Sequence, residues 1–246
     1  MYDNVKLLTD SAELNLSEIA RITNIDGLGP VTAAINTTQI GLNPGARFDS
    51  AHVNYRNIVI EFYVISNVAD NLTELYSAIQ TGTKTTLQIK NKLINCHVES
   101  IEINRTNNPV KGQISLICPD PAFRSAAKNI SLSSNDFISY SGNQPTGFKL
   151  YLTAKTAVRN PYISINANKM TKKSVLNIVL TAGDVLELNS EAGSKSASIA
   201  SKKVYPYTGN FLWPELVPGD NAITIGAASG TVTAKIIYSE KFAAIV

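Results

Sequence analysis

The residues that could do chemistry in this chain are few. Histidine moves protons near neutral pH more often than other side chains, and the sequence has only His52 and His97. His52 lies in an aperiodic stretch, and His97 points away from the apolar face that Cys96 and Val98 form in an expected strand. Neither histidine belongs to a two-histidine helical motif, and no further ligand lies at metal-binding spacing. The sequence therefore predicts no metal site and no catalytic histidine.

Other catalytic signatures are also missing from the sequence. No glycine-flanked serine lies at a strand-to-helix turn, and no glycine-rich loop is suited to phosphate or a dinucleotide. Glu99 and Glu102 fall in an expected strand, where a surface carboxylate is ordinarily solvated. Cys96 and Cys118 end apolar runs and are expected to be buried thiols, with a disulfide between them left open. We expect no catalytic residue, no cofactor and no enzymatic activity.

Composition favours a globular protein of two domains. The chain has 246 residues, of which 44% are hydrophobic and 17% charged, and its formal charge is +3. No run of Lys and Arg forms a stripe that would bind nucleic acid, and the pairs 172–173 and 202–203 are expected in solvated loops. No apolar stretch has the roughly 18 residues of a membrane span, and Met1–Asp10 lacks the pattern of a signal peptide. We expect synthesis in a cytosol and no membrane association.

The stretch from Gln113 to Phe123 predicts where the first domain ends. Ile114, Leu116 and Cys118 share one face of a strand, and Pro119 and Pro121 cannot continue it. Residues 131–147 are rich in serine, glycine and proline, which is typical of a linker. We therefore predict an N-terminal domain over residues 1–130 and a C-terminal domain over residues 131–246.

The first half predicts strands, one helix and a hairpin. Alternation makes Arg56–Val64 a strand, and Leu72–Ile79 has helical spacing with Asn71 as its cap. Residues 31–40 are rich in β-branched side chains and are expected in a strand, whereas Gly41–Asn54 has no period and is expected to be a long loop. Further strands are expected at residues 5–8, 85–89, 93–103 and 113–118, the last two joined by a hairpin.

The second half predicts a β-sandwich. Its expected strands are separated by turn signals about ten residues apart, and no convincing helical period occurs. The expected strands are residues 148–153, 162–166, 175–181, 185–189, 222–226 and 231–238.

A group of aromatic residues in this half admits two interpretations. Tyr205, Tyr207, Phe211 and Trp213 lie close together in sequence. Aromatic rings stack on the apolar faces of sugars, so Tyr207 and Trp213 are candidate carbohydrate-binding residues. Alternatively, Trp213 and its leucine neighbours plug one end of the sandwich core.

Several motifs, in their order along the chain, resemble the distal tail proteins of long-tailed, non-contractile bacteriophages. They are the strand Arg56–Phe62 with the helix after it, the strand ending in residues 118–123, residues 183–188, and Leu212–Ile225. The resemblance covers nearly the whole chain. It departs at Ala122, where the family often has an aromatic residue, and over residues 190–206, which match no part of the family pattern.

The resemblance implies a mainly β protein with a defined place in a virion. It implies an N-terminal sandwich or split-barrel-like belt domain with one helix and a hairpin, and a C-terminal sandwich similar to galectins or carbohydrate-binding modules. It further implies a homo-hexameric ring at the tail tip that joins the tail-tube protein to the tail-tip hub protein and often carries receptor-binding proteins. DNA passes through such a ring without specific binding. The alternative function is a host-carbohydrate-binding module that acts in adhesion.

Overall fold

The computed structural model describes residues 4–41, 44–207 and 211–245. The chain divides into two compact units, Met1–Arg124 with Ala243–Val246 as unit 1, and Ser125–Phe242 as unit 2. The division thus falls before Ser125 rather than between residues 130 and 131, and the chain returns to unit 1 at its end. Unit 2 is therefore an insertion in the sequence of unit 1.

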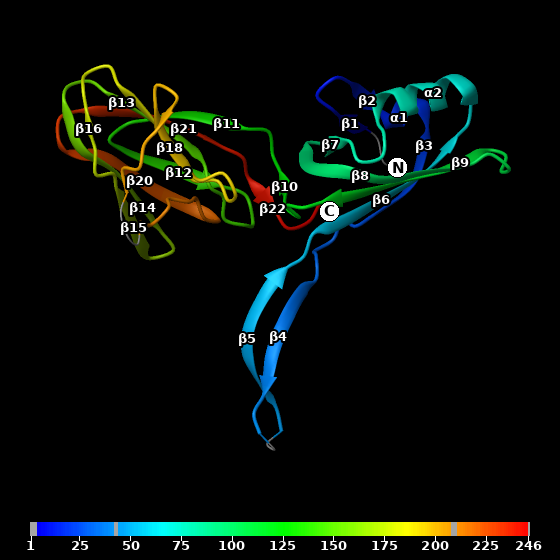
Figure 1. Cartoon of the computed structure of the whole chain (residues 1–246), viewed down its shortest axis with the longest axis horizontal. Helices are drawn as coiled ribbons and strands as arrows, with labels where there is room; N and C mark the ends of the chain where they lie inside the picture. The colour runs from blue at the N-terminus through cyan, green and yellow to red at the C-terminus, as the bar shows by residue number, and fades with distance from the viewer. Residues whose placement is uncertain (1–3, 42–43, 208–210, 246) are drawn as a thin grey trace. The chain divides into compact units, whose positions relative to one another are not determined.

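Unit 1 is built mainly from one antiparallel sheet, with the strand order β2-β1-β7-β8-β9-β6-β3 (Figure 1). Two helices, α1 and α2, complete it. Its elements are β1 (Val5–Leu8), β2 (Glu13–Asn15), α1 (Leu16–Ile19), β3 (Arg21–Asp26), β4 (Ala33–Gln39), β5 (Ala46–Val53), β6 (Arg56–Val64), α2 (Val68–Ala78), β7 (Lys84–Ile89), β8 (Lys92–Asn104), β9 (Val110–Cys118) and β10 (Phe123–Arg124). The predicted strand at β6, the hairpin of β8 and β9, and the mainly β class are confirmed.

The longer helix of unit 1, α2, begins earlier than the sequence predicts. α2 is capped by Asn67, whose φ of 46° is left-handed, and not by Asn71. The Asn71 amide instead donates to the carbonyls of Ile19, at 3.0 Å, and Ser66, at 2.8 Å. Leu72 and Leu75 are buried as the period predicts, so the helical face was predicted correctly and only the start was wrong.

β4 and β5 form a separate two-stranded sheet, which we call the arm (Figure 1). The predicted strand at residues 31–40 corresponds to β4. The expected loop Gly41–Asn54 is wrong, because most of it is β5. Every residue of β5 is exposed, so burial imposes no alternation on its sequence. This explains why periodicity failed to reveal the strand.

Unit 2 is a β-sandwich. One sheet has the order β11-β21-β13-β17-β18-β19, and the other has the order β12-β20-β14-β15, with β16 pairing β14. Both sheets contribute side chains to one hydrophobic core, among them Leu150 and Leu186 from the first and Ile163 and Ile223 from the second. The elements are β11 (Lys128–Leu132), β12 (Asn135–Tyr140), β13 (Lys149–Ala154), β14 (Val158–Ala167), β15 (Met170–Val175), β16 (Val179–Leu180), β17 (Val185–Asn189), β18 (Ser196–Ile199), β19 (Lys202–Lys203), β20 (Gly219–Ser229), β21 (Val232–Tyr238) and β22 (Lys241–Phe242).

Three expectations for unit 2 are wrong. The expected linker at residues 131–147 contains the end of β11 and all of β12, with Leu132, Ile138 and Tyr140 buried. The expected strand at 175–181 is interrupted, because β15 ends where it begins and only the short β16 follows. The lysine pairs at 172–173 and 202–203 lie on β15 and β19 rather than in loops.

Candidate assembly surface

The two histidines are isolated and exposed. His52 lies on β5 and His97 on β8. In residues 4–41, 44–207 and 211–245, no three His, Cys, Asp or Glu side chains gather as metal ligands, and no helix is long and apolar enough to cross a membrane. Glu99 and Glu102 are exposed, and Glu99 accepts a hydrogen bond from Ser115 Oγ at 2.6 Å. That carboxylate therefore has an ordinary structural partner.

Cys96 and Cys118 are free, buried thiols on neighbouring strands of unit 1. The pairing of His97 with Ile117 continues toward them, so the two cysteines face each other across β8 and β9. Hydrogen bonding to Cys96 and burial raise the pKa of Cys118 well above its ordinary value. The Cys118 side chain is thus a protonated thiol and a poor nucleophile.

The strongest polar feature of unit 1 is the buried guanidinium of Arg56, at the start of β6. Its Nε donates to Pro121 O at 2.8 Å, and its NH2 donates to Ala243 O at 2.6 Å. Its NH1 donates to the carbonyls of Gly27 and Gly29, the latter at 2.6 Å. One side chain thereby joins the chain before the arm, the exit of the chain from unit 1 and its return.

In the described contacts of Arg56, the guanidinium meets backbone carbonyls and an aromatic ring and not a carboxylate. Its Cζ lies 4.6 Å from the centroid of Phe123, which is a cation–π contact. Burial lowers the pKa of Arg56, although the guanidinium remains the most basic side chain in proteins. Gly27 lies beside this site with a φ of +86°, and an added Cβ would lie 2.1 Å from Asn57 O. Only glycine fits there without displacing the backbone of β6.

The arm has one apolar face. Its register pairs Ala33 with Val53 and Ile35 with Ala51. After a bulge, Thr37 pairs with Phe48, so that the apolar side chains stay on the same side. The apolar face of the arm comprises Ala33, Ile35, Thr37, Phe48, Ala51 and Val53.

The opposite face of the arm is polar and internally bonded. Asn36 Nδ2 donates to Ser50 Oγ at 3.0 Å. Asp49 accepts a hydrogen bond from Thr38 Oγ1 and another from Arg47 Nε, the latter at 3.0 Å. The polar face therefore has hydrogen-bond partners within the arm, whereas the apolar side chains Ile35, Phe48 and Val53 are exposed.

The apolar face of the arm is open to solvent. Ile35 is 65% exposed, Phe48 62% and Val53 57%. An isolated two-stranded hairpin is marginally stable in water, and contiguous exposed apolar patches usually mark interaction sites. Contact with another surface would therefore stabilise the arm.

Unit 1 also has an open cavity of about 800 Å³ beside its edge strand β3. Its lining includes Arg21 and Ile22 on β3, Tyr63 on β6, exposed Ile65 and Pro109. An edge strand has unpaired backbone groups on its outer side. The cavity therefore combines an apolar wall with a strand edge, which are the features that an incoming β-ribbon requires.

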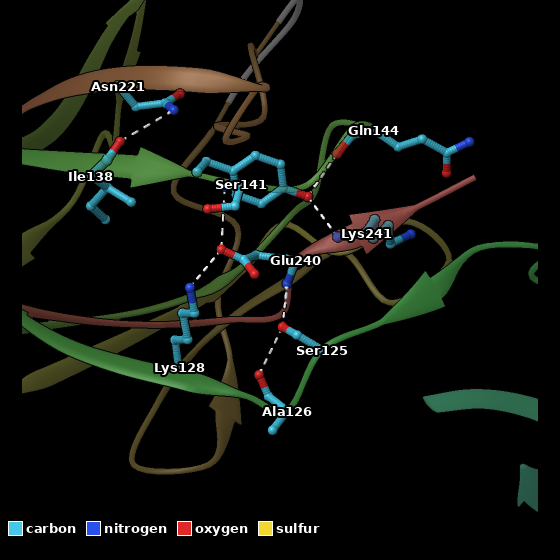
Figure 2. A network of polar contacts seen from close by, with 10 residues as sticks. Ser125, Ala126, Lys128, Ile138, Ser141, Gln144, Asn221, Glu240 and Lys241 are labelled. Carbon is cyan, nitrogen blue, oxygen red and sulfur yellow. Dashed lines mark hydrogen bonds and ion pairs between the residues drawn. The ribbon is translucent and has the colours of Figure 1, made fainter. Parts of the chain in front are cut away.

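In unit 2 a buried carboxylate organises a polar network, which Figure 2 shows. Glu240 Oε1 accepts from Lys128 Nζ at 2.5 Å and from the Ser141 backbone N–H at 3.2 Å. The Glu240 backbone N–H donates to Ser125 Oγ at 3.0 Å, and its carbonyl accepts from the Ser125 N–H at 2.9 Å. Tyr140 Oη accepts from the Lys241 N–H at 2.7 Å. This network ties the first residues of unit 2 to its last ones.

The aromatic residues predicted to bind sugar pack on one another. Tyr207 stacks on Phe211 with centroids 5.1 Å apart and meets Trp213 edge-on at 4.9 Å. Lys195 Nζ lies 5.7 Å from the Trp213 centroid. Tyr207, Phe211 and Trp213 are partly buried against the core of unit 2, while Tyr205 is 76% exposed. Sugar binding by Tyr207 and Trp213 stays a prediction.

Sequence reasoning missed the two buried charges. Arg56 looks like the first residue of an amphipathic strand, and Glu240 follows the last long strand. Their partners lie far away in sequence, at separations of 187 residues for Ala243 and 112 for Lys128. No local signal exists for such contacts. A charged residue in register with an apolar face, as Arg56 is with Ile58, is the only available hint.

Comparison with known proteins gives a family match for part of this chain. Residues 141–242 match a family described as siphovirus-type tail component, C-terminal domain. No curated protein matches the sequence significantly. The solved structures then give a particular relative in fold. The crystal structure of SPP1 Dit (gp 19.1) superposes with a TM-score of 0.77 over 97% of this chain and 99% of that chain, at 10% identity.

A second solved structure matches less well. A chain of the phage P2 baseplate in its activated conformation with Ca has a TM-score of 0.47 and 8% identity, over 96% of this chain and 98% of that chain. The family match and the SPP1 Dit fold together confirm the resemblance to distal tail proteins that the sequence motifs indicated. The chain is a mainly β protein with a fold similar to that of SPP1 Dit.

Proposed function

We propose that this chain is a structural protein of a bacteriophage tail tip that assembles with copies of itself through the arm. The similarity to SPP1 Dit, described as a paradigm of hub adsorption apparatus in phages that infect Gram-positive bacteria, supports a tail-tip role. The family match of residues 141–242 supports a siphovirus tail. Its place would be the tail tip of the virion, after synthesis in the host cytoplasm.

The observation that carries the proposal is the uncovered apolar face of the arm. Phe48 and Ile35 are exposed, and burying apolar surface is favourable by about 25 cal/mol for each square ångström removed from water. A partner that covers these side chains would therefore stabilise the assembled state. The cavity beside β3 is a different surface of the same chain. Contact between two different surfaces is heterologous, and its repetition closes a ring when the rotation per copy allows.

The finer proposal is a ring of six copies that joins the tail-tube protein to the tail-tip hub protein and anchors receptor-binding proteins. DNA would pass through the ring without sequence-specific contacts, in keeping with a formal charge of only +3. The role is geometric rather than catalytic. The ring holds neighbours in a fixed arrangement, and its surfaces do not transform a substrate.

Two substitutions on β5 test the proposal. Phe48→Asp places a charge on the apolar face of the arm, and Ser50→Asp places the same charge on its polar face. We expect the full chain, mixed with its tail-tube and hub proteins, to sediment as a ring, and we expect Phe48→Asp alone to abolish that species. Analytical ultracentrifugation gives the mass, and negative-stain microscopy gives the number of copies.

Each outcome of this test bears on a different level of the proposal. A ring with another number of copies would contradict the hexamer but not assembly by the arm. Equal loss in both variants would contradict the assignment to one face. Persistent monomer in the presence of both tail proteins would contradict the tail-tip role itself.

A further inference from the structure

A small cavity lies in unit 2 at the end of the hairpin formed by β14 and β15. Its volume is about 90 Å³, and its lining includes Ile165, Val217 and Met170. Pockets for whole small molecules are usually about 300–1,000 Å³. This cavity is therefore of a size to take one substituent of a ligand, with the rest of the ligand outside.

The rim of the cavity is polar. Lys172 Nζ lies 2.5 Å from Glu215 Oε1, and the two side chains are 37% and 39% exposed. Asn168 also lines the cavity. The ammonium group has three N–H donors and the carboxylate has two oxygens, so each retains hydrogen-bonding capacity beyond their mutual contact. The rim thus offers a donor and an acceptor side by side above an apolar floor.

The fold holds these groups in place. The register pairs Ile165 with Lys172 and Ala167 with Met170, and a two-residue turn at Asn168 and Lys169, with φ values of 50° and 61°, joins the strands. Positive φ at both positions is the conformation that closes a tight hairpin. The position of the rim residues on β15 is therefore fixed by the hairpin itself.

The opposite wall is fixed by a buried amide. Asn221 is fully buried, accepts from the Val217 N–H at 3.0 Å and donates to Val217 O at 2.9 Å. The same amide approaches Ile138 O, as Figure 2 shows. Val217 and Glu215, two residues before it, are consequently presented by an anchored segment. A preformed wall lowers the entropy cost of binding a ligand.

We propose that this cavity binds the acetamido group of an N-acetylated amino sugar. The methyl group lies between Ile165 and Val217, the amide N–H donates to Glu215, and the amide carbonyl accepts from Lys172. The sugar ring remains outside, where Asn168 can bond its hydroxyls and Met170, 62% exposed, can cover its apolar face. The polar rim favours a sugar over an acetylated lysine side chain, whose methylenes would leave Asn168 without a partner.

This site differs from the pair Tyr207 and Trp213. Those rings already contact each other, with centroids 4.9 Å apart, and Phe211 occupies a further side of each. The cavity instead offers an unfilled apolar floor with polar groups at its edge. The proposal is independent of assembly by the arm, since it uses only residues of unit 2.

Saturation-transfer NMR on the full chain tests the proposal directly. The probes are the methyl glycoside of N-acetylglucosamine and the methyl glucoside that lacks the acetamido group. We expect the acetyl methyl protons to receive the strongest saturation. The glucoside should bind at least about tenfold more weakly, because its hydrogen bonds to charged groups are lost. Glu215→Ala and Lys172→Met should each raise the Kd of the acetylated glycoside about tenfold.

A matched control uses another surface ion pair. Glu13→Ala breaks the contact of Glu13 with Lys6, at 2.7 Å on unit 1, and should leave the Kd unchanged. Trp213 fluorescence checks that each variant keeps unit 2 folded. Equal binding of both glycosides, unchanged binding in Glu215→Ala, or no binding at the highest soluble concentration would overturn the proposal. Binding of an acetyl-lysine peptide in place of the sugar would also overturn it.

Discussion

Arg56 in unit 1 and Glu240 in unit 2 are both buried charges that tie together chain segments far apart in sequence, but their charges are compensated differently. Arg56 donates to backbone carbonyls and lies against Phe123. Glu240 is paired with Lys128, which is itself 45% exposed. The Arg56 guanidinium keeps its charge at any accessible pH, whereas the Lys128 ammonium loses its charge at alkaline pH, above its ordinary pKa because of the hydrogen bond to Glu240. The two units should therefore respond differently to both mutation and pH.

The two units also differ in their exposed strands. In unit 1 the arm leaves Phe48 and Ile35 uncovered. In unit 2 the edge strand β19 consists of Lys202 and Lys203, and lysines on an edge strand oppose pairing with other chains. The contrast favours unit 1 as the unit through which we propose that the chain self-assembles. Four predictions test this contrast, beginning with the largest expected effect.

Arg56→Met should destabilise unit 1 by about 3–5 kcal/mol, because it removes a buried guanidinium that donates to four backbone carbonyls. Trp213 is the only tryptophan of the chain and lies in unit 2, so its fluorescence reports unit 2 alone. In urea denaturation we expect an early transition by circular dichroism and an unchanged midpoint by Trp213 fluorescence. Arg21→Met, an exposed arginine on β3, is the control. Coincident shifts of both signals would mean that the units unfold together.

Glu240→Gln should destabilise unit 2 by about 1–3 kcal/mol, because a charge-assisted hydrogen bond to Lys128 is lost while the size of the side chain is kept. Here the Trp213 midpoint should move and the transition of unit 1 should not. Glu102→Gln, an exposed carboxylate on β8, is the matched control. A shift in the unit 1 transition alone would reverse the assignment of this residue to the stability of unit 2.

The sequence predicts elements of the molecule where burial imposes a pattern. Arg56–Val64 and Val185–Asn189 were bounded correctly because alternate side chains enter a core. β5 was missed because both of its faces are exposed, and β12 was missed because its buried Ile138 and Tyr140 follow a polar, serine-rich stretch and alternate with a serine. Composition resembling a linker therefore concealed an amphipathic strand.

The candidate sites were harder to predict than the fold. The arm requires knowing that a bulge keeps Phe48 on the same face as Ile35. The cavity of unit 2 requires Glu215 to lie beside Lys172, 43 residues earlier. Such pairings depend on strand topology, which local periodicity does not specify. The motifs that resemble distal tail proteins indicated the fold later found in SPP1 Dit but none of these contacts.

Alkaline pH should lower the free energy of unfolding of unit 2. Burial raises the pKa of Tyr140 and Tyr238 above 10.0, and hydrogen bonding to Glu240 raises that of Lys128 above 10.5. Raised pKa values in the folded state give stability that is complete below pH 10 and lost as pH rises through the folded values. Tyr238→Phe keeps the ring that packs on Tyr140 and removes one titrating group. The fall in Trp213-monitored stability should then be shallower by up to about 1.4 kcal/mol per pH unit, and an unchanged slope would exclude Tyr238 as a contributor.

The smallest effect is expected on the polar face of the arm. Asp49→Asn weakens the contacts of Asp49 with Thr38 and Arg47, which are close to solvent, so the free energy of unfolding should change by less than about 0.5 kcal/mol. Assembly should be unaffected, because the apolar face is intact. The informative comparison is with Phe48→Asp, one residue away, which should abolish the ring at similar monomer stability. If Asp49→Asn also prevented assembly, the polar face of the arm would be required for assembly. The proposed contact would then depend on charge rather than on the exposed apolar surface of the arm.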